Sequence, residues 1–121
     1  MVTVLVVEDS FSQRQLLTNI LEASNFQVAT ASDGKEALEY LAQFCPDLIL
    51  LDIIMPNLNG YDVCRHLKKN PQTQNLPVII CSSKGEELDL YWGFKQGADA
   101  YLVKPFQPKT LVETVKQLTT A

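Results

Sequence analysis

The sequence predicts an α/β protein, a doubly wound five-stranded parallel sheet of the (βα)5 type. Five short apolar runs alternate with five helix-length segments along 121 residues. Three of the runs are apolar on both faces, which is typical of buried parallel strands. This alternation predicts helices on both faces of one sheet, joined by right-handed connections. The length predicts a single domain.

The predicted strands are four or five residues long and rich in β-branched residues or leucine. The first begins near the amino terminus, and the third and fourth are the most continuously apolar. The five strands are expected at residues 3–7, 26–30, 47–51, 77–81 and 100–103.

Helix-start and helix-stop signals occupy the segments between these strands. Ser10 and Asp33 each stand three residues before Gln or Glu, which is the capping-box pattern. Asn59 can cap the third helix. The fourth helix is expected to end before Gly97, and Pro108 suits the first turn of the fifth.

Charge and composition exclude several classes of protein. The net charge of −4 argues against nucleic-acid binding, which usually needs a basic surface. No apolar stretch approaches the length that a bilayer requires, so we expect no membrane insertion. Three widely spaced cysteines do not form a disulfide pattern. These features predict a cytoplasmic protein.

Polar residues that can carry chemistry stand where four of the strands end. Glu8 and Asp9 follow the first strand, Asp52 the third, Ser82 the fourth and Lys104 the fifth. In open parallel sheets, ligands bind beyond the carboxyl ends of the strands. Clustered carboxylates suit Mg²⁺, while a hydroxyl and an ammonium group can contact a phosphoryl group. This set therefore predicts phosphoryl transfer to a carboxylate.

Four segments in order carry a resemblance to the receiver domain of bacterial two-component response regulators. They are residues 6–10, 51–60, 76–83 and 97–106. The resemblance extends over nearly the whole chain and implies the flavodoxin-like receiver fold with strand order 2-1-3-4-5. It also implies that residues 1–121 form one receiver domain with no output domain.

The resemblance implies a role for each residue at the strand ends. Asp52 would accept the phosphoryl group from a histidine kinase, and Lys104 would pair with the phosphoryl oxygens. Ser82 would move toward the phosphoryl group as Tyr101 turns inward. The Lys104–Pro105 peptide bond would be cis. The Mg²⁺ ligands would be Glu8, Asp9, Asp52 and the backbone carbonyl of Ile54.

One position departs from the fast-resetting chemotaxis members of this family. Ile54 stands two residues after Asp52, where those members carry a polar residue that helps water reach the phosphoryl group. An apolar side chain should hinder that water. We therefore expect a longer-lived phosphorylated state.

The fourth helix supplies a candidate surface for a downstream effector protein. Its apolar residues fall into two arcs that point apart, one with Leu88, Tyr91 and Trp92, the other with Leu90 and Phe94. Either arc could be core, so apolar side chains should lie near solvent. With Tyr101 nearby, the predicted surface comprises the fourth helix, the fifth strand and the fifth helix, centred on Leu90, Phe94 and Tyr101.

Together these features predict a phosphorylation-activated switch that regulates a partner in chemotaxis, phototaxis or pilus motility. Residues 83–98 also resemble single-domain regulators of type IV pilus motility and phototaxis. The protein would transfer a phosphoryl group to itself without being a turnover enzyme. Two alternatives stay open: a phosphorelay intermediate that passes phosphate to a histidine phosphotransfer protein, and a phosphorylation-independent interaction module.

Two enzymatic or cofactor-binding alternatives conflict with the residues. A flavin or dinucleotide binder needs phosphate-cradling glycines after the first strand, where this chain has Glu8 and Asp9. A phosphatase of the haloacid-dehalogenase type needs an acid two residues after the nucleophile, where this chain has Ile54.

Overall fold

Five parallel strands form one sheet in the order β2-β1-β3-β4-β5, which confirms the predicted topology. The computed structural model describes residues 1–120. Each strand is followed by a helix, as the alternation of apolar runs predicts. The strands are β1 (Thr3–Val7), β2 (Gln27–Ala31), β3 (Leu48–Leu51), β4 (Val78–Ser82) and β5 (Ala100–Val103). The helices are α1 (Phe11–Ala23), α2 (Gly34–Leu41), α3 (Gly60–Lys69), α4 (Glu87–Lys95) and α5 (Pro108–Thr119).

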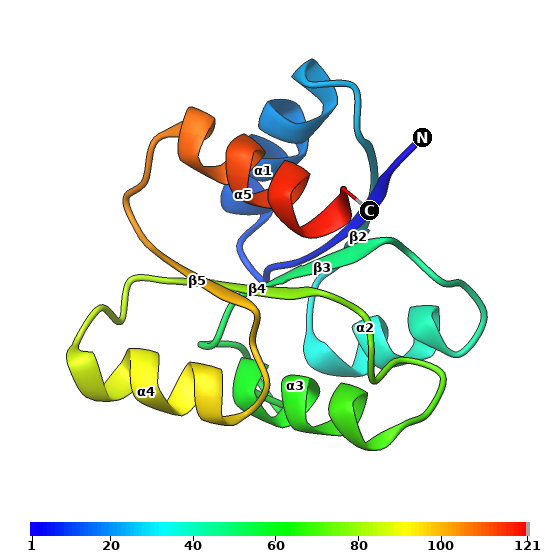
Figure 1. The fold of residues 1–121 in the computed structure, drawn as a ribbon, viewed down its shortest axis with the longest axis vertical. Helices are drawn as coiled ribbons and strands as arrows, with labels where there is room; N and C mark the ends of the chain where they lie inside the picture. Colours follow the sequence, from blue (N-terminus) through cyan, green and yellow to red (C-terminus); the bar gives the residue numbers. More distant parts are fainter. Residues whose placement is uncertain (121) are drawn as a thin grey trace.

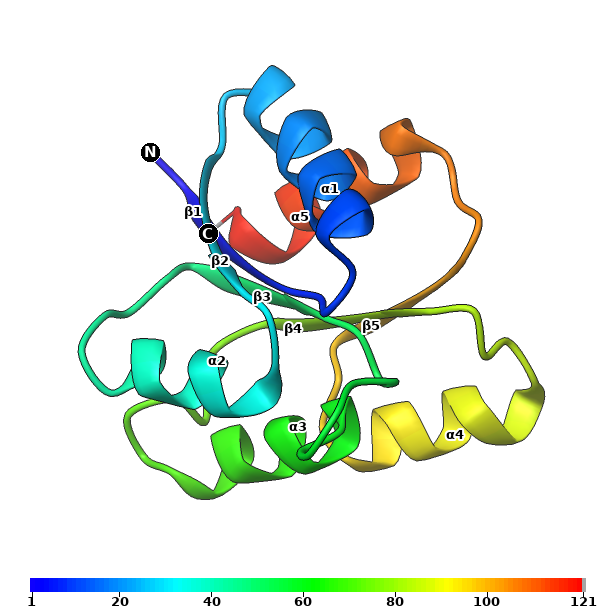
Figure 2. The ribbon, with the colours of Figure 1, turned by 180° about the vertical axis from the view of Figure 1, so that it is seen from behind.

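The sheet is the middle layer of a three-layer molecule. Helices α1 and α5 cover one face, and α2, α3 and α4 cover the other (Figure 1). Turning the molecule by half a turn shows the same division from behind (Figure 2). One apolar cluster lies under α1 and α5, and a second lies mainly under α2 and α3.

The three strands that read as apolar on both faces are the central ones. Every residue of β3 and β4 is buried, as is every residue of β1 after Thr3. Burial on both faces explains why these strands carry no alternating polar positions. The edge strands β2 and β5 are less buried, and their sequences include polar residues or tyrosine.

The helix-capping predictions are confirmed at three helices. The side chains of Ser10, Asp33 and Asn59 each accept a hydrogen bond from the backbone N–H three residues later. Gly97 follows α4 with a φ of 107°, a conformation that favours glycine. Pro108 stands at the start of α5. The caps therefore fix where the loops at the strand ends enter the helices.

The observed elements differ from the predicted ones in small ways. Strand β2 lies one residue later than predicted, and β4 begins and ends one residue later. The Lys104–Pro105 peptide bond is cis, as the resemblance implies. Among the helices of residues 1–120, none combines the length and hydrophobicity needed to cross a bilayer.

Candidate functional site

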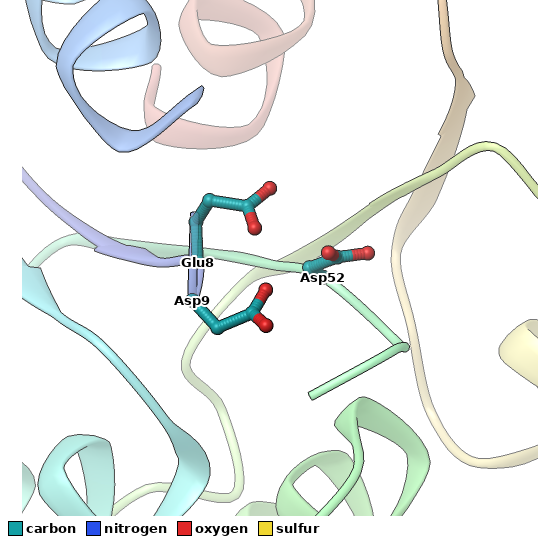
Figure 3. Close-up of side chains that lie close together, drawn as sticks. All are labelled: Glu8, Asp9 and Asp52. Carbon is teal, nitrogen blue, oxygen red and sulfur yellow. The ribbon is translucent and has the colours of Figure 1, made fainter. Parts of the chain in front are cut away.

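Three carboxylates converge beyond the carboxyl ends of β1 and β3. Each of Glu8, Asp9 and Asp52 offers one oxygen that lies within 4.8 Å of the other two. Figure 3 shows the side chains of Glu8 and Asp9 extending from the end of β1 toward Asp52 at the end of β3. Because β1 pairs with β3 in parallel, Val7 and Leu51 are register partners, and the residues that follow them become neighbours. Sheet topology therefore assembles the acidic cluster.

Glu8 is only 2% exposed, and its backbone and carboxylate groups all have hydrogen-bond partners within the protein. Its backbone N–H donates to the Ala31 carbonyl at 3.1 Å, and its carbonyl accepts from Arg14 Nη1 at 2.7 Å. Its carboxylate accepts from Lys104 Nζ at 2.7 Å and from the Ser10 N–H at 3.2 Å. Glu8 is thus a buried charge in a fixed position.

Lys104 bridges two of the carboxylates from the end of β5. Its Nζ lies 2.7 Å from Glu8 Oε1 and 3.8 Å from Asp52 Oδ2. The cis peptide bond follows directly after this residue. A single ammonium group therefore offsets only part of the negative charge of the cluster, which favours a further cation or a reduced charge on one carboxylate.

The pKa values of the three acidic residues shift in different directions: those of Asp9 and Asp52 are raised, and that of Glu8 is lowered. Burial, followed by the charge of Glu8, raises the pKa of Asp52 to about 6. Burial and the neighbouring Glu8 also raise the pKa of Asp9. For Glu8, burial acts to raise the pKa, but hydrogen bonds from Lys104 and the Ser10 N–H outweigh it and leave the pKa lowered. Glu8 therefore stays ionised, whereas burial and the nearby negative charge disfavour the ionised form of Asp52.

Asp52 is held at the start of a tight turn between β3 and α3. Its N–H donates to the Val7 carbonyl at 3.1 Å, and its Oδ1 accepts from the Ile53 N–H at 2.8 Å. Gly60 closes the turn by donating to the Ile53 carbonyl at 2.9 Å. A Cβ at Gly60 would lie 2.2 Å from the Asp52 carbonyl oxygen, so only glycine permits this close approach.

The remaining sequence-predicted polar residues lie on the next two strands. Ser82 is fully buried at the end of β4, and its Oγ accepts from the Lys84 N–H at 3.2 Å. Tyr101 of β5 donates its hydroxyl to the Lys84 carbonyl at 2.6 Å. The backbone of Lys84 is therefore bound on both sides by the two residues to which the resemblance assigns the switch. Burial is the main cause of the raised pKa of Tyr101.

The apolar residues that the sequence singled out differ in how far they are exposed to solvent. Ile54, two residues after Asp52, is 54% exposed. On α4, Phe94 is exposed and Leu90 is half-buried, while Leu88, Tyr91 and Trp92 are all exposed. Neither predicted arc of α4 belongs to the buried core. The buried residue of this helix is Gly93, which faces the Tyr101 ring.

Two residues near the site were not found by sequence reasoning. Arg14 of α1 donates to the Glu8 carbonyl, and Tyr61 of α3 donates its hydroxyl to the Asp89 carbonyl at 3.1 Å. Both contacts join side chains to backbone groups of other elements. Arg14 is one polar residue of an amphipathic helix and Tyr61 one aromatic residue of another, so neither carries a local signal.

The donor set fits a hard divalent cation. Magnesium prefers carboxylate and carbonyl oxygens and keeps several waters. The cluster supplies three carboxylates, and the exposure of Asp9 leaves one side open to solvent. Burial and the charge of Glu8 raise the pKa of Asp52, and a cation at this position would favour its ionised form.

Comparison with known proteins agrees with the geometry. A family model described as the response regulator receiver domain matches residues 4–116. Protein PilH of Pseudomonas aeruginosa is 41% identical over 115 residues, covering 95% of this chain and 95% of PilH. The DNA-binding response regulator MtrA of Mycolicibacterium paratuberculosis is 39% identical over 113 residues. That match covers 93% of this chain and 49% of MtrA, so the chain spans about half the length of that relative.

Solved structures share the fold over almost the whole chain. The signal receiver domain of a histidine kinase from Syntrophus aciditrophicus has a TM-score of 0.93 at 35% identity, covering 99% of this chain and 91% of that one. The chemotaxis protein CheY4 of Vibrio cholerae has a TM-score of 0.92 at 32% identity, covering 98% of each chain. With the acidic cluster, Lys104 and the strand order in place, the matched family follows: this chain belongs to the response regulator receiver domains.

Proposed function

We propose that this protein is a phosphorylation-activated signalling switch whose phosphoacceptor is Asp52. The observation that carries the proposal is the convergence of Glu8, Asp9 and Asp52, with Lys104 beside them. The histidine kinase is the phosphodonor, and Mg²⁺ is the cofactor. Glu8, Asp9, Asp52 and the backbone carbonyl of Ile54 would hold the ion, which would supply positive charge for the phosphoryl oxygens.

The chemistry of this chain's residues is a single group transfer. A carboxylate oxygen of Asp52 forms a new bond to phosphorus while the bond from phosphorus to the donor imidazole nitrogen breaks. The electron pair of the broken bond stays on the imidazole. Lys104 neutralises charge on the transferred oxygens, and Ser82 donates its hydroxyl to one of them. The protein acts once per phosphoryl group and is not a turnover enzyme.

The output is a change in binding to an effector protein. Ser82 and Tyr101 both bond to the backbone of Lys84, which leads into α4. The effector surface is formed by α4, β5 and α5, with Leu90, Phe94 and Tyr101 at its centre. Similarity to PilH supports assignment to the pilus or chemotaxis-like subgroup of cytoplasmic regulators. The name of MtrA describes a DNA-binding regulator, and this description applies to that longer protein.

The direct test uses acetyl phosphate as a small phosphodonor. Wild-type protein incubated with acetyl phosphate and Mg²⁺ should gain the mass of one phosphoryl group. Asp52→Ala should abolish the gain, because it removes the nucleophile. Asp62→Ala, which removes a carboxylate of α3 paired with Arg65, should leave it intact. A mass gain that survives Asp52→Ala would overturn the assignment.

A further inference from the structure

Helix α4 is the most weakly buried helix of the molecule. Of its residues Glu87–Lys95, only Gly93 is buried. A Cβ at Gly93 would lie 2.8 Å from the Tyr101 ring, so the helix backbone rests directly on that ring. A helix with so little buried apolar surface is held by individual contacts and is easily displaced.

Two tyrosine hydroxyls hold the segment that contains α4. Tyr101 donates to the Lys84 carbonyl at 2.6 Å, just before the helix. Tyr61 donates to the Asp89 carbonyl at 3.1 Å, in the first turn of the helix. Burial is the main cause of the raised pKa of Tyr61, so its hydroxyl remains a hydrogen-bond donor at neutral pH.

Tyr61 is also connected to the phosphoacceptor through the backbone. It follows Gly60, whose N–H donates to the Ile53 carbonyl at 2.9 Å. Gly60 itself is pressed against the Asp52 carbonyl. A short path of close contacts therefore runs from Asp52 through Gly60 and Tyr61 to α4. Tyr61 is partly buried and packs against the apolar cluster under α2 and α3, which limits its freedom to move independently.

We propose that Tyr61 is a positioning residue of the switch, whose bond to the Asp89 carbonyl holds α4 over the ring of Tyr101, which is turned inward against the apolar cluster under α2 and α3. This role rests on the proposed function, because it regulates the same site. The resemblance associates inward Tyr101 with the phosphorylated state. If Tyr61 favours that arrangement, reciprocity of coupled equilibria requires that removing its hydroxyl disfavour phosphorylation.

The first measurement needs no phosphodonor. Tyr61→Phe removes one hydroxyl and keeps the ring, and Tyr91→Phe removes the hydroxyl of an exposed tyrosine on α4 as the matched control. Amide hydrogen exchange in α4 should become about fivefold faster in Tyr61→Phe alone, equivalent to the roughly 1 kcal/mol net value of a hydrogen bond. Amides of β1 and β3 should keep their wild-type rates.

Two exchange results overturn the proposal. One is that α4 exchanges no faster in Tyr61→Phe than in Tyr91→Phe. The other is that amides throughout the sheet accelerate as much as those of α4, because that would be a general loss of stability. Neither result depends on whether Asp52 is phosphorylated.

The second measurement is the steady-state fraction phosphorylated with acetyl phosphate and Mg²⁺. The ratio of phosphorylated to unphosphorylated protein should fall by up to about fivefold in Tyr61→Phe and stay unchanged in Tyr91→Phe. An unchanged or higher ratio in Tyr61→Phe overturns the role of Tyr61 alone. A wild-type protein that gains no phosphoryl group overturns the proposed function instead.

Discussion

At the scale of single residues, two neighbouring carboxylates are driven in opposite directions. Lys104 Nζ lies 2.7 Å from Glu8 and 3.8 Å from Asp52, so Glu8 receives most of the compensating charge. The pKa of Glu8 is lowered, whereas that of Asp52 is raised to about 6. The cluster thus keeps one permanent anion and one carboxylate whose ionisation is costly without a cation.

Asp52→Asn tests this cost in metal-free protein. A carboxyl group with a folded-state pKa above its unfolded value contributes stability below the unfolded pKa and loses it as the pH rises through the folded pKa. The contribution of Asp52 to the stability of the wild-type protein should therefore fall between about pH 4 and pH 6. Asp52→Asn should be up to about 3 kcal/mol more stable than wild type at pH 7, at roughly 1.4 kcal/mol per pKa unit, and nearly equal at pH 4.

Denaturant unfolding in EDTA at both pH values measures this difference. Asp62→Asn, which alters a carboxylate outside the cluster, serves as the control. A wild-type protein that is more stable than Asp52→Asn at pH 7 would contradict this prediction, because it would show that the folded state stabilises ionised Asp52.

Ile54 should control how long the phosphoryl group lasts. Its apolar side chain is exposed two residues after Asp52 and should hinder a water that attacks the phosphoryl group. Ile54→Asn should speed loss of phosphate by roughly three- to tenfold, about 1 kcal/mol of barrier. The decay of phosphorylated protein after removal of the phosphodonor measures it. Leu16→Asn, at an exposed apolar position of α1, should decay at the wild-type rate. Equal decay in both variants contradicts this role.

At the scale of elements, the β3–α3 turn brings the phosphoacceptor and helix α3 together. Asn59 caps α3 by accepting from the Asp62 N–H at 3.0 Å, and Gly60 lies against the Asp52 carbonyl. Asn59 and Gly60 therefore stabilise this turn in different ways. Asn59 satisfies a free backbone donor, while Gly60 permits two backbone segments to touch.

Substitution of these neighbours should separate the two effects. Asn59→Ala should lower the free energy of unfolding by about 1 kcal/mol, the usual value of a lost helix cap. Gly60→Ala should cost more, about 2 kcal/mol or above, because the added Cβ meets a backbone carbonyl that cannot rotate away. Denaturant unfolding measures both. A Gly60→Ala variant as stable as Asn59→Ala would show that the turn relaxes easily.

The elements were largely predictable from the sequence because their signals are local. Apolar runs, caps at Ser10, Asp33 and Asn59, and Gly97 after α4 act within a few residues. Convergence of the acidic residues was predictable because parallel strands end at one edge. The contacts of Arg14 and Tyr61 were not, since each depends on how a helix is oriented over another element. The sequence left open which arc of α4 is buried, because the buried position of this helix is Gly93, which belongs to neither arc.

At the scale of the whole molecule, the site joins three strands that are distant in sequence. Glu8 and Asp9 follow β1, Asp52 follows β3 and Lys104 follows β5. A cation bound by the acidic residues would link the ends of β1 and β3 and remove repulsion between them. Ligand binding to the folded state alone stabilises it by mass action.

Mg²⁺ should therefore raise the melting temperature of the wild-type protein. At a concentration of about 100 times its dissociation constant, the gain in stability is about 2.7 kcal/mol. Asp9→Asn should lose most of this gain while remaining at least as stable as wild type without Mg²⁺, because Asp9 is exposed and repelled by Glu8. Sodium chloride at equal ionic strength controls for screening. Equal Mg²⁺ stabilisation of both proteins would contradict the assigned ligands.

The proposed switch depends on the passage of a phosphoryl group from an imidazole nitrogen to Asp52. The most direct measurement uses phosphoimidazole, whose bond from phosphorus to nitrogen matches that of the donor histidine. Intact mass and peptide mapping follow the protein with Mg²⁺ and with EDTA. We predict one phosphoryl group, on the peptide that contains Asp52, formed only with Mg²⁺. Phosphorylation at another residue, or none with Mg²⁺ present, would contradict it.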